Sequence, residues 1–434
     1  MLAAKNDVDG ADVDWWFMYK LPEGVGRQAK TTGNEYLYYD GVECKKLTLS
    51  PHRLGTAAQG ALFHTMNQLF DSASGSSDSI GWIHYNDEYP YSLDHGDWAP
   101  KVPPKYYSEK AREKDRGHPV DCAHNGHCKG TLMFDLESDT AVWLAHSTPR
   151  IPDLHEDPAT RFFYPDYAYK YAQTFICITL KDVATANQIA AVLARQHEPQ
   201  VFGCKLPERV TQDSQWSDLW TLAQGHEPPA YSQAYVKEHG KRPPTDMSFQ
   251  SSAGKDFRLI AKSGAWMDDF WINLVGPTLQ TDLRVETWRR LTATAGLPVD
   301  TVNGQAEFGD KDFETDHNNH EYHHEFEDGD QKHLEDEITT VDLSVLTDAQ
   351  GQPLTGISWS YTHDHAKWSI SESDAEHGVH TLDTEPGTAQ SWICVADINR
   401  MTSQEKRGGG AICFHEPALW QDLNEIEKID GQIT

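Results

Sequence analysis

Hydrophobic and polar positions alternate in short runs along the first part of the chain. Aromatic-rich segments at 14–19 and 35–39 are bounded by turn-forming residues, so each predicts a β-strand. A third strand is expected at 81–85. Between 59 and 71, apolar residues recur at the spacing that buries one face of a helix, which predicts a helix there.

The same kinds of pattern continue through the rest of the chain. Asp182 is suited to cap the start of a helix that carries an apolar stripe over 189–193. Segments at 257–261 and 283–288 predict strands or short helices. Strands that alternate with helices indicate the α/β class.

The length predicts more than one domain. A chain of 434 residues exceeds the usual size of about 100 to 200 residues per domain, and two domains are expected. Glycine and proline residues interrupt any regular pattern between 222 and 247. The boundary is therefore placed near residue 230, giving halves 1–230 and 231–434.

Composition indicates a folded, globular protein. Apolar residues make up 38% of the chain and aromatic residues 11%, which is enough to build a core. No stretch approaches the roughly 20 apolar residues that a membrane span requires, and the first twenty positions are rich in charge. We therefore expect no membrane segment, and either a cytoplasmic location or export without a leader.

The net charge argues against a nucleic-acid partner, because lysine and arginine provide most of the affinity for DNA. That charge is −30, but protonation of all 22 histidines would change it to −30 + 22 = −8. An acidic working pH would thus remove most of the repulsion, and a basic cleft can coexist with an acidic exterior.

The seven cysteines form no Cys-x-x-Cys pair, so neither a zinc knuckle nor a dense disulfide framework is predicted. Three of them, Cys177, Cys394 and Cys413, lie in apolar runs and are expected in the core, as free cysteines usually are.

Carboxylates and histidines crowd the segment 310–337. Its His320 and His324 would share one face of a helix, so divalent-metal binding is conceivable. No flanking apolar pattern fixes a ligand geometry, which favours a solvated acidic loop, and no metal site is predicted.

Two short motifs repeat across the halves. A first motif, His127-Cys-Lys129, and a second, His365-Ala-Lys367, each lead into an apolar strand. A second echo follows, in which 173–177 and 390–394 share the order Gln, polar, aromatic, Ile, Cys. Two paired similarities in the same order predict duplicated halves.

On a strand, residues i and i+2 project from one face, which sets each imidazole beside an ammonium group. Two such strands related by a pseudo-two-fold would place two imidazoles and two ammonium groups around one anion. This arrangement suits phosphoryl transfer: one histidine attacks phosphorus, the other protonates the leaving oxygen, and the lysines hold the non-bridging oxygens. Neither a metal nor another cofactor is needed. A lone motif is a weak signal, so the argument depends on the two copies.

Other residues carry weaker signals. The pair His146-Ser147 ends an apolar run and could contact the phosphate, or could cap a strand before Pro149. Asp397 and Asn399 are suited to orient a histidine and to contact substrate, or belong to a turn. The glycine run 407–410 could admit a phosphate or form a plain turn.

At these residues the sequence resembles the deoxyribonuclease II family of acid endonucleases. The resemblance covers most of the chain except the first dozen residues and the 310–337 insertion. The segments that carry it are 14–22, 36–40, 82–87, 127–130, 143–147, 364–368, and 397–404 with 407–410. The last of these, 397–404 with 407–410, is the most specific.

The resemblance implies a phospholipase D-like fold of two α/β/α halves with mixed sheets, related by a pseudo-two-fold, with DNA in a cleft between them. It also implies metal-independent cleavage through a phosphohistidine, favoured by acid, that leaves 3′-phosphate and 5′-hydroxyl ends. His127 would be the nucleophile and His365 the general acid, although a symmetric site could run either way. Lys129 and Lys367 would hold the phosphate. Animal members are typically secretory or lysosomal with disulfides, whereas this chain shows no leader and an odd number of cysteines.

Two alternatives remain open. One is a phospholipase D-type phosphodiesterase that acts on lipid head groups, and the other is a non-catalytic protein of this fold that binds DNA or metal. A homodimer is a further arrangement, but two motifs in one chain favour a site within that chain.

Overall fold

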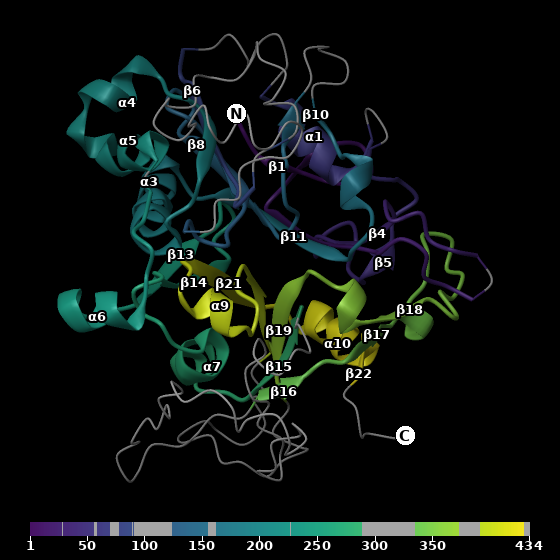
Figure 1. Ribbon diagram of the computed structural model, residues 1–434. Helices are drawn as coiled ribbons and strands as arrows, with labels where there is room; N and C mark the ends of the chain where they lie inside the picture. The colour runs from purple at the N-terminus through teal and green to yellow at the C-terminus, as the bar shows by residue number, and fades with distance from the viewer. Residues whose placement is uncertain are drawn as a thin grey trace, which may run out of the picture.

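The computed structural model describes residues 1–27, 29–55, 59–69, 78–88, 90, 124–154, 162–225, 227–288, 335–372 and 391–428. Two large sheets dominate it, one above the other in Figure 1. The upper sheet belongs to the N-terminal half, in the order β12 (Val201–Lys205), β6 (Ile80–Tyr85), β7 (Gly130–Asp135), β8 (Thr140–His146), β11 (Gln173–Leu180), β3 (Trp15–Lys20), β4 (Tyr36–Tyr39) and β5 (Thr48–Leu49).

The lower sheet belongs to the C-terminal half. Its order is β13 (Thr245–Gln250), β14 (Asp256–Lys262), β21 (Gly409–His415), β20 (Trp392–Ala396), β19 (Lys367–Ser371), β15 (Leu283–Thr287) and β16 (Glu335–Glu337). Neighbouring strands are antiparallel in both sheets except β15 and β16, which are parallel. Three smaller sheets join β1 (Ala4–Lys5) to β2 (Asp12–Val13), β9 (Asp153–Leu154) to β10 (Phe162–Phe163), and β18 (Ser358–Ser360) through β17 (Thr340–Asp342) to β22 (Glu427–Lys428).

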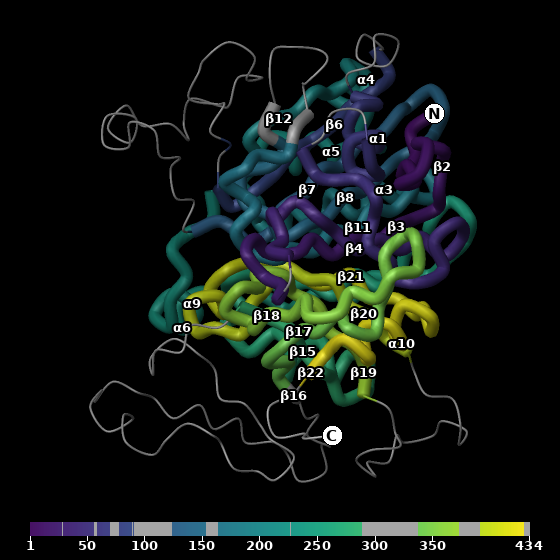
Figure 2. Tube along the Cα trace, turned by 90° about the vertical axis from the view of Figure 1, so that its right-hand side faces the viewer, coloured from purple at the N-terminus to yellow at the C-terminus, as the bar shows by residue number. Residues whose placement is uncertain are grey.

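Alternation along β3 shows how the two sheets share a core. Trp15 and Phe17 point into a cluster that both sheets build, whereas Trp16 and Met18 point to the opposite face of the upper sheet. The Trp15 ring meets that of Phe414 on β21 edge-on, with centroids 5.0 Å apart. Both views place the N-terminal half on one side of this core and the C-terminal half on the other (Figures 1 and 2).

The helices pack around the two sheets, and several of them contribute residues to the core that both sheets build. They are α1 (Ala61–Asn67), α3 (Val183–Val192), α4 (Glu208–Gln212), α5 (Ser217–Gln224), α6 (Gln233–His239), α7 (Gly276–Leu279), α9 (Thr402–Glu405) and α10 (Pro417–Ile426). Asp182 caps α3 as predicted, since its side chain accepts a hydrogen bond from the Thr185 N–H at 2.7 Å. The helix predicted over 59–71 is confirmed but shorter, as α1.

The predicted strands at 14–19, 35–39 and 81–85 are confirmed as β3, β4 and β6. The segments at 257–261 and 283–288 form β14 and β15. The mixed α/β class is thus confirmed, although the sheets are almost entirely antiparallel. Within the described residues, no helix is both long and apolar enough to cross a membrane.

The second sequence echo does not mark equivalent strands. Residues 173–177 lie on β11, which is separated from β7 by β8, whereas the described part of 390–394 lies on β20, directly beside β19. The match reflects two buried strands of similar composition, so this part of the argument for duplication was wrong.

The expectation for the cysteines needs one correction. Cys394 and Cys413 are buried as predicted, but they face each other on β20 and β21 and form a disulfide. Cys177 is buried and free, as expected.

Candidate active site

The two His-x-Lys motifs lie at the starts of strands rather than along them. His127 and Lys129 precede β7, which begins at residue 130, and His365 precedes β19, which begins at Lys367. Each motif thus leads into an apolar strand as expected, but only Lys367 lies within its strand, so strand alternation does not by itself pair each histidine with its lysine. Hydrogen bonds from the other half of the chain occupy the histidine backbone at these positions.

Each motif is tied to the opposite sheet by the N–H of its histidine. The His127 N–H donates to the carbonyl of Gly408, just before β21, at 2.8 Å. The His365 N–H donates to the carbonyl of Ala172, just before β11, at 3.0 Å. The position of each histidine thus depends on the half that does not carry it.

The motif lysines fold back in the same way in both halves. The Lys129 ammonium donates to the His127 carbonyl at 3.3 Å, and the Lys367 ammonium donates to the His365 carbonyl at 2.5 Å. Both lysines are buried. Each ammonium is therefore held close to the backbone of its own histidine.

The first motif has a defined histidine tautomer. Nδ1 of His127 lies 2.7 Å from the carbonyl oxygen of Asp397. A carbonyl can only accept, so Nδ1 carries the proton and the other nitrogen, Nε2, is left to act as a base or nucleophile. Asp397 therefore contacts His127 through its backbone carbonyl rather than through the side chain singled out from the sequence.

The Asp397 carboxylate contacts a different histidine. Its Oδ2 lies 3.2 Å from Nδ1 of the buried His197 and 3.3 Å from the N–H of Gly410. His197 ends the helical turn that follows α3, and nothing in its local sequence pointed to the site. These contacts fix the segment whose carbonyl holds His127.

Aromatic rings enclose the second histidine. The Tyr171 ring stacks on His365 with centroids 3.8 Å apart and an interplanar angle of 9°, and the Trp288 ring lies 4.4 Å away. Nε2 of His365 has no hydrogen-bond partner among the described residues. Burial, then the charges of Lys367 and Lys129, lowers the pKa of His365 to about 2.

The four motif side chains share one electrostatic environment. Burial lowers the pKa of His127 well below its usual value, and the charges of Lys129 and Lys367 lower it further. Burial, then Lys129, lowers the pKa of Lys367 to about 7. Each motif thus senses the lysine of the other, which is what a common site for one anion requires.

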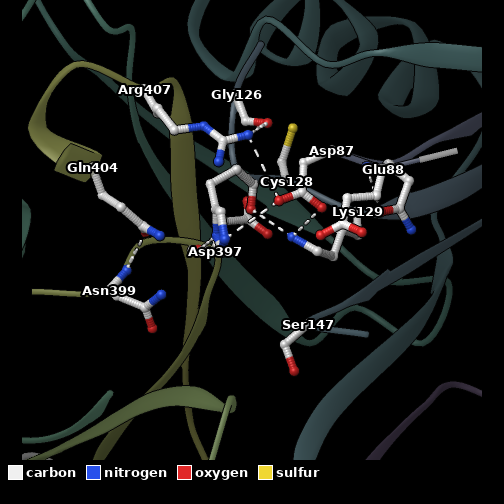
Figure 3. A network of polar contacts seen from close by, with 12 residues as sticks. Asp87, Glu88, Gly126, Cys128, Lys129, Ser147, Asp397, Asn399, Gln404 and Arg407 are labelled. Atoms are coloured by element: carbon white, nitrogen blue, oxygen red, sulfur yellow. Dashed lines mark hydrogen bonds and ion pairs between the residues drawn. The ribbon is translucent and has the colours of Figure 1, made fainter. Parts of the chain in front are cut away.

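Asp87 and Arg407 complete this site, and neither was among the predicted site residues. The Asp87 carboxylate lies 2.8 Å from the Lys129 ammonium, 3.3 Å from Nε2 of His127 and 3.6 Å from the Arg407 guanidinium. Figure 3 shows Arg407 and Lys129 approaching this carboxylate from different sides. Burial raises the pKa of Asp87, but the surrounding cations outweigh it and hold that pKa below its usual value. Asp87 lies two residues after the predicted strand at 81–85, and that position was the available signal.

His146 and Ser147 lie beside the motifs without contacting them through their side chains. The His146 N–H donates to the Lys129 carbonyl at 3.1 Å, whereas its two ring nitrogens have no partner among the described residues. The Ser147 hydroxyl accepts from the Thr174 N–H at 3.0 Å and donates to Gln173, and Figure 3 shows Ser147 apart from the charged cluster. Their expected contact with substrate stays a prediction.

Asn399 positions the segment that carries Trp288, a residue beside His365. Its side-chain oxygen accepts from the Trp288 N–H at 3.2 Å, and its own N–H donates to Gln404 at 2.7 Å. Asn399 thus holds the segment whose ring contacts His365. The neighbouring Arg400 is buried against Asp269, at 2.9 Å, and takes a structural role.

The glycine run at 407–410 serves close packing. A β-carbon on Gly408 would lie 2.4 Å from the Gln196 carbonyl oxygen, and one on Gly410 would lie 2.6 Å from Nε2 of His197. Glycine therefore lets this loop reach the His197 turn and bring Arg407 to Asp87.

Metal binding by 310–337 cannot be placed, because 310–334 lies outside the described residues. Elsewhere in the described ranges, no group of three or more His, Cys, Asp or Glu side chains could hold a metal ion.

Comparison with known proteins gives the family. The family model described as Deoxyribonuclease II matches residues 5–429, most of the chain. The chain belongs to the deoxyribonuclease II family. It is 32% identical to a putative deoxyribonuclease-2 of Burkholderia pseudomallei over 99% of this chain and 93% of that protein. It is also 28% identical to deoxyribonuclease-2 of Caenorhabditis elegans, over 97% and 92% of the two chains, and 26% identical to human deoxyribonuclease-2-beta, over 97% and 88%. Both the predicted family and the predicted class, a phosphodiester hydrolase, are confirmed.

Proposed function

We propose that this deoxyribonuclease II family protein is a metal-independent endonuclease that cleaves DNA in one site formed by both motifs. The observation that carries the proposal is the convergence of two imidazoles and two buried ammonium groups from opposite halves. Each histidine is hydrogen-bonded to the other half, and each senses the charge of the other motif's lysine.

The sheet topology supports a pseudo-two-fold and a phospholipase D-like pair of halves. In the upper sheet, the order β6-β7-β8-β11-β3 places β3, the first of these strands in the chain, at the end of the series beside β11, which is the last of them in the chain. In the lower sheet, the order β15-β19-β20-β21-β14 repeats this arrangement strand for strand. The motifs occupy closely similar places, at the start of β7 and at the start of β19.

The first chemical step falls to His127. Its proton on Nδ1 is directed to the Asp397 carbonyl, so the Nε2 lone pair is free to attack phosphorus. Lys129 and Lys367 stabilise the negative charge that builds up on the non-bridging oxygens. The bond from phosphorus to the 5′-oxygen breaks, which releases the downstream strand and leaves a phosphohistidine still esterified to the 3′-oxygen of the upstream strand.

His365 is suited to protonate the leaving 5′-oxygen. In the free protein its low pKa keeps it neutral, because Lys367 and Lys129 lie near and burial disfavours its charge. A bound phosphodiester anion offsets those lysines and raises the pKa, so the protonated fraction grows as the pH falls. After proton donation, neutral His365 takes a proton from water as that water attacks the phosphohistidine, which releases a 3′-phosphate and restores His127. Activity favoured at acid pH follows from this step.

Plasmid cleavage in excess EDTA tests the proposal. We expect nicking that is stronger at about pH 5 than at about pH 7.5, as a protonated general acid requires. A His127→Ala variant should lose it, and a Lys241→Met variant, altered at an exposed surface lysine, should retain it. Cleavage that requires an added divalent ion would contradict the two-histidine mechanism.

A change of leaving group tests the division of roles. A thymidine 3′-phosphodiester with a p-nitrophenyl leaving group needs little protonation of the departing oxygen. His365→Ala should therefore regain much of its lost rate on this ester relative to DNA, whereas His127→Ala should stay inactive on both. Rescue of His127→Ala instead would reverse the two roles.

A further inference from the structure

The Asp87 carboxylate occupies an unusual position for a side chain of the protein itself. It lies between two cations, the Lys129 ammonium at 2.8 Å and the Arg407 guanidinium at 3.6 Å, and 3.3 Å from Nε2 of His127. Two cations around one carboxylate form the kind of arrangement that binds the oxygens of a phosphate.

The direction of the His127 lone pair adds a second constraint. Because Nδ1 carries the proton, Nε2 points its lone pair to where phosphorus must arrive. An attacking atom sits about 3 to 3.5 Å from its target before reaction. Asp87 Oδ2 stands at that range from Nε2, so the carboxylate occupies the approach to the nucleophile.

We propose that Asp87 holds the place of the scissile phosphate in the free protein, and that Arg407 is a third phosphate-binding cation. This inference rests on the proposed function, which supplies the phosphodiester as the ligand. On binding, the phosphate displaces the Asp87 carboxylate and takes over its contacts with Lys129 and Arg407. Asp87 is thus a built-in competitor for the anion site.

Arg407 is anchored for such a role. Its Nε donates to the Asn125 carbonyl at 2.8 Å and its Nη2 to the Gly126 carbonyl at 3.2 Å, just before the first motif. These contacts fix the guanidinium, which comes from the C-terminal half, against the N-terminal segment that carries His127. The side chain is therefore oriented before any phosphate binds.

Competition between two anions couples binding to protons. A phosphate close to the displaced carboxylate raises the pKa of Asp87, since like charges disfavour a second ionisation. Several groups from different elements act on Asp87 and favour its ionised form in the free protein. They are His127 and Lys129 before β7, Arg407 before β21 and Lys367 at the start of β19. The charge of Asp87 also acts on His146, at the end of β8. Proton uptake by Asp87 on binding makes the affinity for an anion rise as the pH falls.

Sulfate is a suitable probe, because its charge is constant between about pH 5 and about pH 8 and it is not hydrolysed. Sulfate affinity can be measured by calorimetry on the whole protein for wild type and three variants. Asp87→Asn removes the competitor, and Arg407→Gln removes the proposed ligand. Glu88→Gln is the matched control, since this carboxylate is one residue away and pairs with Arg150.

We expect Asp87→Asn to bind sulfate at least about tenfold more tightly than wild type at about pH 7, and to lose most of the pH dependence. Arg407→Gln should weaken binding across the pH range, and Glu88→Gln should match wild type. Equal or weaker binding by Asp87→Asn, or unchanged binding by Arg407→Gln, would overturn the inference.

Thermal unfolding gives a second readout if Asp87→Asn is too unstable for calorimetry. Loss of a buried carboxylate leaves cations without a partner, so Asp87→Asn should be less stable. Sulfate should then raise its unfolding temperature more than that of wild type, whereas an equal or smaller shift would count against the inference. Plasmid cleavage in EDTA is scored separately. If wild type cuts DNA but Asp87→Asn does not bind sulfate more tightly, only this inference is refuted. If Asp87→Asn binds sulfate more tightly but wild type does not cut DNA, the proposed function is refuted.

Discussion

Lys262 makes a sharp prediction about stability because its ammonium group is completely buried. It ends β14 and donates to the carbonyls of Gln404, Glu405 and Arg407 at 3.0, 2.7 and 2.8 Å. These residues form the loop that presents Arg407 to Asp87. The loop leads to Gly408, whose carbonyl accepts a hydrogen bond from the His127 N–H. Burial lowers the pKa of Lys262 from 10.5 to about 7, although nearby carboxylates oppose it.

The pKa of Lys262 fixes how stability changes with pH. Between the folded pKa of about 7 and the unfolded value of 10.5, the unfolded chain binds a proton that the folded chain does not. Stability contributed by this group is therefore complete above the unfolded pKa and is lost as the pH falls toward the folded pKa. Within that window, Lys262 adds about 1.4 kcal/mol to the unfolding free energy for each unit of pH.

Urea unfolding followed by tryptophan fluorescence measures this slope between about pH 7.5 and about pH 9.5. In Lys262→Met the slope should fall by about 1 kcal/mol per pH unit relative to wild type, because that linkage disappears. The matched control is Lys241→Met, whose ammonium is exposed, and it should keep the wild-type slope. Equal slopes for wild type and Lys262→Met would refute the argument that this lysine is buried and perturbed.

Two further predictions concern the second histidine and the disulfide. Tyr171→Ala should lower kcat on DNA by about 2- to 10-fold through loss of the ring stacked on His365, while Tyr171→Phe keeps the ring and most of the rate; equal losses would show that stacking is not the cause. Reduction of the Cys394–Cys413 bond, whose partners are 19 residues apart, should lower the unfolding free energy by about 3 kcal/mol. A Cys394→Ala/Cys413→Ala double variant should be insensitive to reductant, and a wild type that is equally insensitive would contradict the assignment.

Local patterns in the sequence were enough to place several strands and the motif residues. The continuous apolar run 15–19 reflects burial on both faces of β3, and Asp182 caps its helix through a contact three residues away. His127 and His365 could be found because each precedes a strongly apolar strand.

The remaining site residues depend on contacts that no local pattern records. Asp87 and Arg407 are 320 positions apart, and His197 reaches Asp397 across the boundary between the two sheets. The disulfide depends on the register of β20 against β21, which places Cys394 opposite Cys413. Such pairings follow from how the sheets stack and from strand register, so composition and spacing alone could not identify them.

The two halves differ at one position of equal register, and this difference separates the roles of the histidines. The residue after each motif lysine is Gly130 in one sheet and Trp368 in the other. Gly130 pairs with Tyr85, and Asp87 lies two residues beyond it. Trp368 pairs with Glu286, and Trp288 lies two residues beyond it. In the first half this position supplies a carboxylate beside His127, the proposed nucleophile. In the second half it supplies a ring.

That ring suits a general acid. An aromatic face stabilises an imidazolium without adding an anion that would hold its proton too tightly, so a protonated His365 between Trp288 and Tyr171 can still release its proton to the leaving oxygen. A carboxylate at the same place would instead raise the pKa of the acid and slow proton transfer. The asymmetry therefore favours attack by His127 and protonation by His365 over the reverse assignment that a strictly symmetric site would allow.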